Sequence, residues 1–491
     1  MSNTMQSEAD IHTGADVYPG ESEAELGRSL KARHVSMIAI GGIIGAGLFV
    51  GSSTAIVSAG PAVILSYGLA GAIVLIIMRM LSEMAVAIPG IQSFPEFSRL
   101  GLGHLAGFLS GWLYWYFWVV VVAIEAIAGA VIISSWILLP TWLIGVGLMA
   151  VLTAVNLMST KSYGEFEFWF SSIKVAGIIV FILITGGYAL GVLNPAGPTF
   201  GNLTEYGGFA PNGAMSVLAT TTSVIFALVG AEIATIAAAE SAEPSRTVAR
   251  MTSTVALRIL VFYILSVFLI VAVVPWNTIV PGQSPFTAAL SAVGIPGAAM
   301  IMKVIVLVAV LSCLNSGLYV TSRVLFTLAG RGDAPQALVS VNKRKVPVRA
   351  IVMASLFSYV ALAASVLSPE VVFSFLVNAS GALMLIVYLM IALSQIRLRR
   401  RFEAECPERL TIRTWFFPWG SYLGVAAICI ILAAMAATPG MAAEFWSSIA
   451  VTAFFALLYF FLRRGKAEPL DPLDPLDPLD PLDPLAHIDA N

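Results

Sequence analysis

Long apolar segments separated by short polar connections occupy most of the chain. Each segment is long enough to cross the hydrocarbon core of a bilayer as a helix, which takes about 20 residues. The segments lack the period-two alternation of a membrane β-barrel, and a helix satisfies its own backbone hydrogen bonds in lipid. We therefore predict an all-α integral membrane protein of about twelve transmembrane helices. The predicted spans are residues 36–57, 62–82, 106–137, 141–159, 168–192, 214–239, 254–274, 298–328, 348–367, 371–395, 415–437 and 441–462.

Composition excludes a water-soluble globular protein. Hydrophobic residues make up 58% of the chain and charged residues only 11%, whereas a typical soluble domain has about 25% charged residues. The mean hydropathy is +0.91. Membrane lipid is therefore the expected surroundings of most of the chain.

The basic residues indicate how the spans are oriented. With the N-terminus inside, all Lys and Arg residues except Lys174 and Lys303 fall at or near predicted cytoplasmic connections, and the outer loops at 193–213 and 275–297 contain none. Lys and Arg gather on the cytoplasmic side of membrane proteins. We therefore predict cytoplasmic termini, a bacterial inner membrane location, and a first span that serves as the targeting signal. The net charge of −2 does not indicate a nucleic acid partner.

Four regions follow from this pattern. Residues 1–30 form an acidic cytoplasmic tail that is expected to be disordered, and residues 465–491 form a cytoplasmic tail that repeats Pro-Leu-Asp. Between them lie the first ten predicted helices, at 31–397, and the last two, at 398–464. The three cysteines and four histidines form no metal-ligand or disulfide pattern, so no metal and no cofactor is expected.

Four glycines interrupt the first predicted span. Gly41, Gly42, Gly45 and Gly47 lie within seven residues near its middle. A helix that unwinds there frees backbone groups, which a membrane tolerates only where they line a cavity or bind a ligand. The freed N–H groups would then form a site for a carboxylate. Alternatively, Gly41 and Gly45 form a GxxxG motif that serves close helix packing.

The sixth predicted span carries a second interruption, from Phe226 through Val229 and Gly230 to Glu232. The first span runs outward and the sixth inward, so the two interrupted helices are inverted copies five spans apart. This layout is typical of secondary transporters, in which the substrate binds between the broken helices. The topology therefore predicts a transporter built from two inverted repeats.

Three ionisable residues, Glu125, Lys174 and Glu232, lie inside predicted spans. Inserting such a group at mid-bilayer costs about 2.5 to 3.5 kcal/mol, so a partner is expected. Their opposite signs indicate that Lys174 pairs with one of the two acids. Proton movement through the pair would couple transport to the proton gradient, whereas a static buried ion pair would be structural only. Glu240 and Lys303 lie nearer helix ends, where long side chains reach the interface.

Aromatic residues cluster from Trp112 to Trp118 in the third span. Such clusters form a belt at the membrane interface more often than a cage around a substrate. We therefore predict an interfacial belt.

Several segments carry a family resemblance: Gly42 to Ser52, Glu165 to Trp169 with Lys174, Leu314-Asn315-Ser316 with Tyr319, and Ser322-Arg323. These segments resemble bacterial amino acid permeases of the amino acid-polyamine-organocation superfamily. The resemblance extends from about Lys31 to Arg464. Within the superfamily, residues 235–241, 275–277 and 331–335 are most similar to γ-aminobutyrate permeases.

The resemblance implies a five-plus-five inverted repeat with two additional helices, and a substrate site between the first and sixth spans that includes Gly45 and Gly230. The N–H groups of Ala46 and Gly47 would bind the carboxylate of a small zwitterionic amino acid, with γ-aminobutyrate as the leading substrate. Backbone carbonyls would accept from its amine, and Phe226 would close over it. These carbonyls belong to Ile43, Phe226 and Val229.

The resemblance also implies the coupling ion. Relatives hold a lysine like Lys174 where sodium-coupled cousins hold a sodium ion, which implies proton symport through Lys174, Glu125 and Glu232. The amine of γ-aminobutyrate is three methylenes from its carboxylate, so it reaches either the carbonyls or one of these acids.

Other functional classes remain to be weighed. An enzyme would need a nucleophile with its base or a set of metal ligands inside the spans, and a channel would need a pore loop or a ring of like charges. The sequence shows neither. A permease for another amino acid (β-alanine, proline, asparagine, lysine or an aromatic one), an exchanger and a non-transporting sensor stay open.

Overall fold

The computed structural model describes residues 44–463, except 89–90, 92, 159, 231, 233–254, 343–345, 364–365 and 367, and except the side chains of 160–166 and 463. The predicted tails at 1–30 and 465–491 lie outside the described residues. All described secondary structure is helical. Its elements are α2 (Ala46–Phe49), α3 (Gly51–Ala59), η2 (Gly60–Ala62), α4 (Val63–Ala87), α5 (Phe94–Leu102), α6 (His104–Ser134), α7 (Thr141–Met158), α8 (Thr160–Ala189), η3 (Phe200–Leu203), α9 (Gly213–Leu228), the π-helix η4 (Ile259–Leu265), α12 (Ser266–Val273), η5 (Trp276–Thr278), α13 (Pro285–Val293), α14 (Ala298–Gly330), η6 (Gln336–Val339), α15 (Val348–Ala363), α16 (Pro369–Glu405), η8 (Pro407–Arg409), α17 (Trp419–Ala437) and α18 (Ala442–Arg463).

The predicted spans each have a helical counterpart in the described part of the chain. Nine segments there are long and apolar enough to cross a membrane, and one of them, Ala46–Ala87, joins the first two predicted spans. Two shorter apolar helices, α9 and α15, stand where the sixth and ninth spans were predicted. The all-α membrane fold is therefore confirmed. Two nine-residue helices, α5 and α13, were not predicted because they are too short to cross a bilayer.

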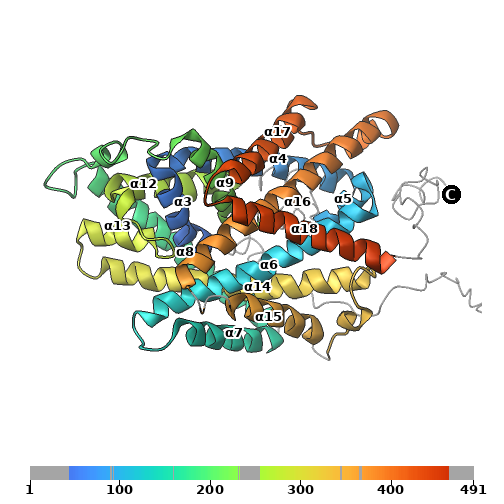
Figure 1. Ribbon diagram of the computed structural model, residues 1–491, viewed down its shortest axis with the longest axis horizontal. Coiled ribbons are helices and arrows are strands. Elements are labelled where there is room, and N and C mark those ends of the chain that lie inside the picture. The colour runs from blue at the N-terminus through green and yellow to red at the C-terminus, as the bar shows by residue number, and fades with distance from the viewer. Residues whose placement is uncertain are drawn as a thin grey trace, which may run out of the picture.

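The two halves of the fold follow the same order of elements. In the first half, the short helix α5 lies between the second and third spans, α4 and α6. In the second half, α13 lies between the second span, Val255–Val273, and the third, α14. The two short helices lie at opposite ends of the molecule (Figure 1). Equivalent elements at opposite ends are what an inverted repeat requires.

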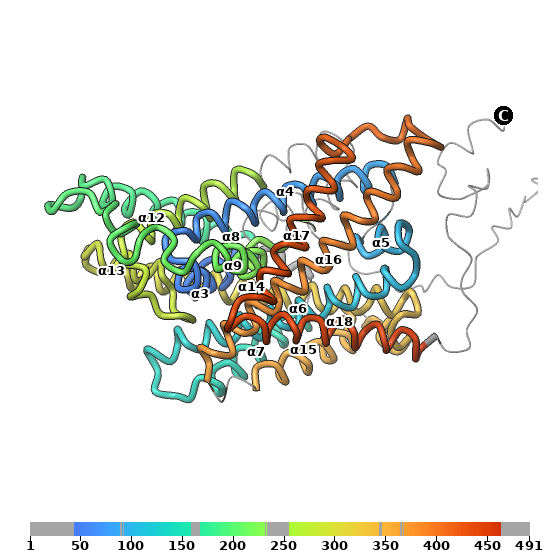
Figure 2. Tube along the Cα trace, turned by 45° about the horizontal axis from the view of Figure 1, so that its top comes forward, coloured from blue at the N-terminus to red at the C-terminus, as the bar shows by residue number. Residues whose placement is uncertain are grey.

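Corresponding helices of the two halves pack against each other. The third helices, α6 and α14, are in contact through the middle of the bundle, and the fourth helices, α7 and α15, contact each other on one outer side (Figures 1 and 2). The first spans of the two halves, α2–α3 and α9, also pack together. The additional helices α17 and α18 both contact α16. The arrangement brings the two interrupted helices side by side.

Most described basic residues lie at one end of the helices, which we name the basic end. It contains the C-terminal ends of α14 and α16, and α16 continues to Glu405, beyond the predicted limit of residue 395. Arg399 is buried there and pairs with Glu83 of α4 at 2.7 Å. The other end, which holds the end of α6, the start of α14 and the helix α13, is named the opposite end.

Candidate functional site

The first span begins with a short helix that is broken from the rest. Gly45 precedes α2 in a non-helical conformation (φ −138°, ψ −148°), and Val50 separates α2 from α3. The first N–H groups of a helix have no partner within it. The amide of Ala46 donates instead to Glu125 of α6, with its nitrogen 2.9 and 3.0 Å from the two carboxylate oxygens. A carboxylate is therefore bound at the predicted break, and it comes from the protein itself.

The second break follows α9. Leu228 is its last residue, Val229 is extended, and Gly230 has a φ of 107°, which favours glycine. In a continuous helix the Gly230 amide would donate to the Phe226 carbonyl, but it donates to Glu232 at 2.9 and 3.1 Å. The Phe226 carbonyl therefore does not receive the Gly230 amide that a continuous helix would provide.

Two tyrosines complete the surroundings of Glu232. Tyr114 of α6 and Tyr388 of α16 donate to its oxygens at 3.1 and 3.5 Å. Glu232 is fully buried. Each helix break is thus covered by one buried carboxylate, Glu125 at the first and Glu232 at the second.

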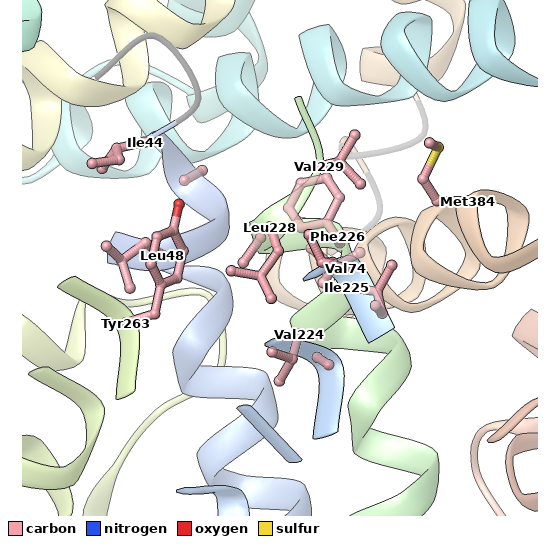
Figure 3. Close-up of a cluster of buried hydrophobic side chains, with 14 of the residues drawn as sticks. Ile44, Leu48, Val74, Val224, Ile225, Phe226, Leu228, Val229, Tyr263 and Met384 are labelled. Atoms are coloured by element: carbon pink, nitrogen blue, oxygen red, sulfur yellow. The ribbon is translucent and has the colours of Figure 1, made fainter. Parts of the chain in front are cut away.

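The broken helices approach so closely that one position admits only glycine. A Cβ atom added at Gly47 would lie 2.8 Å from the Ala227 Cα and 3.2 Å from the Phe226 ring. Figure 3 shows Phe226 and Leu228 of α9 beside Leu48 of α2, with Val229 at the end of α9. Close packing at Gly47 thus accompanies the helix break, whereas the predicted GxxxG motif includes Gly41, which lies outside the described residues.

A small cavity lies between the two breaks. Its volume of ≈ 20 Å³ is room for about one water molecule. Four of the predicted site residues line it: Gly47, Glu125, Phe226 and Val229. Ile43 lies outside the described residues. The remaining lining residues are Phe117, Trp118, Val121, Ala227 and Cys313.

Cys313 of α14 connects the cavity to the first break. A Cβ atom at Gly45 would lie 2.5 Å from the Cys313 Cβ and 2.5 Å from a Glu125 oxygen. Gly45 is therefore enclosed by α6 and α14, and a larger residue there would displace the Glu125 carboxylate. The sequence analysis did not single out Cys313 as a site residue.

Lys174 has a different partner from the two predicted acids. Its Nζ lies 3.6 Å from Glu167, and both side chains are fully buried in α8. Ser312 of α14 donates to the same Glu167 oxygen at 2.6 Å. Glu167 was overlooked because the predicted span begins at residue 168, whereas α8 begins earlier and places Glu167 two turns before Lys174 on the same face. Lys174 still attracts Glu125 electrostatically.

The prediction of an interfacial aromatic belt was wrong. Tyr114, Trp115, Phe117 and Trp118 are all less than 5% exposed. Phe117 and Trp118 line the cavity, and the Phe117 ring centroid lies 6.1 Å from that of Phe226. Helical spacing is the signal that was missed, since Phe117, Val121 and Glu125 recur every four residues and share one face of α6.

Asn315, in one of the segments that resemble amino acid permeases, does not line the cavity. Asn315 accepts from Asn156 of α7 at 2.8 Å, which makes it a contact between two helices. Among the described side chains, no group of three or more His, Cys, Asp and Glu residues is arranged to hold a metal ion. The chemistry of the site is therefore built from backbone amides and carbonyls, two carboxylates and aromatic walls.

Comparison with known proteins gives a consistent result. Residues 34–469 match the family model described as amino acid permease. The γ-aminobutyric acid permease of Bacillus subtilis is 48% identical over 450 residues, which are 91% of this chain and 96% of the relative. The γ-aminobutyric acid permease of Escherichia coli is 43% identical over 86% of this chain and 91% of its own. The aromatic amino acid transport protein AroP of Corynebacterium glutamicum is 37% identical, covering 90% and 96%.

Proposed function

Because the chain belongs to the amino acid permease family, we propose that it imports γ-aminobutyrate together with a proton by alternating access. Membership in this family identifies the protein as a multi-pass bacterial membrane transporter of amino acids and not an enzyme. The substrate, the coupling ion and the orientation are the proposal. Higher identity to relatives named for γ-aminobutyrate than to those named for aromatic amino acids supports the substrate.

The bidentate contact of Glu125 with the Ala46 amide is the observation that carries this proposal. It demonstrates that the first break presents a donor to a carboxylate at the edge of a cavity. The substrate carboxylate takes this place when Glu125 leaves, and the adjacent Gly47 amide is its second donor. Charge-assisted hydrogen bonds of this kind are roughly twice as strong as neutral ones.

The opposite side of the cavity suits the rest of the substrate. The carbonyls of Phe226 and Val229, at the second break, accept from the amine. The Ile43 carbonyl, which lies outside the described residues, stays a predicted third acceptor. Phe117, Trp118 and Val121 supply apolar walls for the three methylenes of γ-aminobutyrate. An α-amino acid has a single carbon, its Cα, between the carboxyl and amino groups.

Protonation of Glu125 couples the transport of γ-aminobutyrate to that of the proton. A neutral carboxyl group competes weakly for the Ala46 amide, so protonation releases the amide to the substrate carboxylate. After both are released inward, the ionised Glu125 returns to the amide. Lys174, paired with Glu167 inside α8, is the buried cation of the proposed coupling path. Glu232, held by Tyr114 and Tyr388, provides the matching carboxylate at the second break.

The orientation follows from the charge distribution. The basic end carries the segments 323–349 and 397–413, and Lys and Arg gather on the cytoplasmic side. Both termini then lie in the cytoplasm, and γ-aminobutyrate reaches the site from the opposite end.

Uptake into proteoliposomes tests the function directly. Radiolabelled γ-aminobutyrate is presented to amino-acid-free vesicles with an inward proton gradient, alone and against unlabelled β-alanine, proline, asparagine, lysine and phenylalanine. We expect accumulation that short ω-amino acids compete for most strongly and that a protonophore abolishes. If only an α-amino acid displaces the label, the substrate is that amino acid and not γ-aminobutyrate. If uptake requires vesicles preloaded with amino acid, the protein is an exchanger and not a symporter.

A further inference from the structure

A second, larger cavity lies toward the opposite end of the molecule. It is a groove of ≈ 370 Å³ between the end of α6, the connection that follows it, α7 and α14. Its lining side chains are apolar, with one glycine among them. They are Ile133, Ile137, Leu139, Leu143, Ile144, Gly147, Leu148, Val151, Leu152 and Leu311.

One cation stands beside the groove. The Lys303 Nζ of α14 lies 2.8 Å from the Ser135 hydroxyl and 5.8 Å from the ring centroid of Trp136, both in the connection that lines the groove. Among the described Lys and Arg residues, Lys303 alone lies at the opposite end, and no described Asp or Glu forms an ion pair with it. Trp and Lys together are typical of the level of lipid headgroups.

The groove runs from this level toward the middle of the bilayer. From Leu143 to Leu152 along α7 the rise is about 13 Å, and from Lys303 to Leu311 along α14 it is about 12 Å. One leaflet of hydrocarbon is about 15 Å thick, half of a core of about 30 Å. A chain anchored at Lys303 therefore has a trough nearly one leaflet deep beside it.

We propose that this groove binds one anionic phospholipid, with its phosphate on Lys303 and Ser135 and one acyl chain along α7. The groove lining contains no acid, so the ammonium group of a zwitterionic headgroup has no partner there. The apolar lining offers an amino acid substrate or a peptide no hydrogen bond. The site is independent of the transport cavity and does not rest on the proposed substrate.

Substitution of a glycine that lines the groove, Gly147, can fill the groove with a side chain. A Cβ atom added at Gly147 meets nothing within 4 Å, so a larger side chain there enters the groove without displacing the fold. Gly68 of α4 is equally unobstructed and is exposed outside the groove. Gly147→Leu and Gly68→Leu are therefore a matched pair that adds the same side chain inside and outside the proposed site.

Native mass spectrometry of the full chain, released from bilayers of equal phosphatidylglycerol and phosphatidylethanolamine, tests the proposal. We expect one retained phosphatidylglycerol in the wild type, Lys303→Arg and Gly68→Leu proteins. Gly147→Leu should lose it, and Lys303→Gln should retain about fivefold less, the effect of one Lys at a lipid surface.

Two results would overturn the proposal: equal retention of the two lipids by the wild type, or unchanged phosphatidylglycerol retention by Lys303→Gln. Size-exclusion chromatography and γ-aminobutyrate uptake, measured on each variant, verify folding. Because Lys303 is partly exposed, its variant gives a result even if Gly147→Leu does not fold.

Discussion

Both carboxylate oxygens of Glu125 lie within hydrogen-bond distance of the Ala46 amide nitrogen, at 2.9 and 3.0 Å. The two residues are 79 positions apart, on the first and third spans. A protein carboxylate thus stands where a substrate carboxylate is proposed to bind. The two cannot occupy this amide together, so the proposed function makes the charge state of Glu125 control access to the site.

Glu125→Gln should uncouple transport from the proton gradient. The amide oxygen of Gln still accepts from Ala46, but the side chain carries no exchangeable carboxyl proton. A gradient of one pH unit across the vesicle membrane stores about 1.4 kcal/mol per proton. Coupling to one proton therefore supports an inside-to-outside substrate ratio of about ten. We expect the wild type to approach this ratio and the variant to stay near one, while counterflow exchange of labelled for unlabelled substrate continues. Tenfold accumulation by the variant would mean that a group other than Glu125 carries the coupled proton.

Gly47→Ala should impair transport through a steric clash. The new methyl group would lie 2.8 Å from the Ala227 Cα, a backbone atom that cannot rotate away. Overpacking of this kind costs about 1–3 kcal/mol, which corresponds to roughly 5- to 150-fold in uptake rate. Gly51→Ala is the control, because its nearest contact is 3.5 Å away. Similar initial uptake rates in both variants would mean that the two breaks need not approach each other.

Lys174→Ala should abolish gradient-driven accumulation and also reduce stability. Removing one member of a buried ion pair leaves Glu167 uncompensated, at a cost of about 3–5 kcal/mol. Combining Lys174→Met with Glu167→Gln removes both charges and should recover the detergent melting temperature without recovering accumulation. Concentrative uptake by this double variant would mean that Lys174 has a structural role only and takes no part in proton coupling.

Alkylation of Cys313 by N-ethylmaleimide should block uptake. Its thiol lines the cavity between the breaks, so an added group occupies the space that the substrate needs. Saturating γ-aminobutyrate should slow the inactivation. Cys313→Ala should transport normally and resist the reagent, although Cys406 and Cys429 remain available for reaction. Inactivation of the Cys313→Ala protein would place the sensitive thiol outside the cavity.

The membrane fold could be predicted from sequence because lipid imposes a simple rule. A spanning helix needs about 20 apolar residues, and the pattern showed where each one lies. Helices that do not span escape this rule. The nine residues of α5 and of α13 were missed for that reason, although their equivalent positions in the two halves are the clearest sign of the repeat.

The site could be predicted only in part. The glycine run from Gly41 to Gly47 and the segment from Phe226 to Glu232 indicated where the helices are interrupted, because backbone freedom is a local property. Glu167, the ion-pair partner of Lys174 within α8, was missed because it fell one residue outside the predicted span. The aromatic run was misread because composition, without helical phase, does not distinguish a buried face from an interfacial one.

A cavity with room for about one water molecule affects every affinity measured on this protein. The conformation that accepts substrate must be wider, so it is a different member of the ensemble. The apparent dissociation constant is then the intrinsic one divided by the fraction of molecules already wide. A substitution that loosens α2 against α9, which both line the cavity, would tighten binding without touching the substrate. Weaker helix packing can therefore appear in the laboratory as higher affinity.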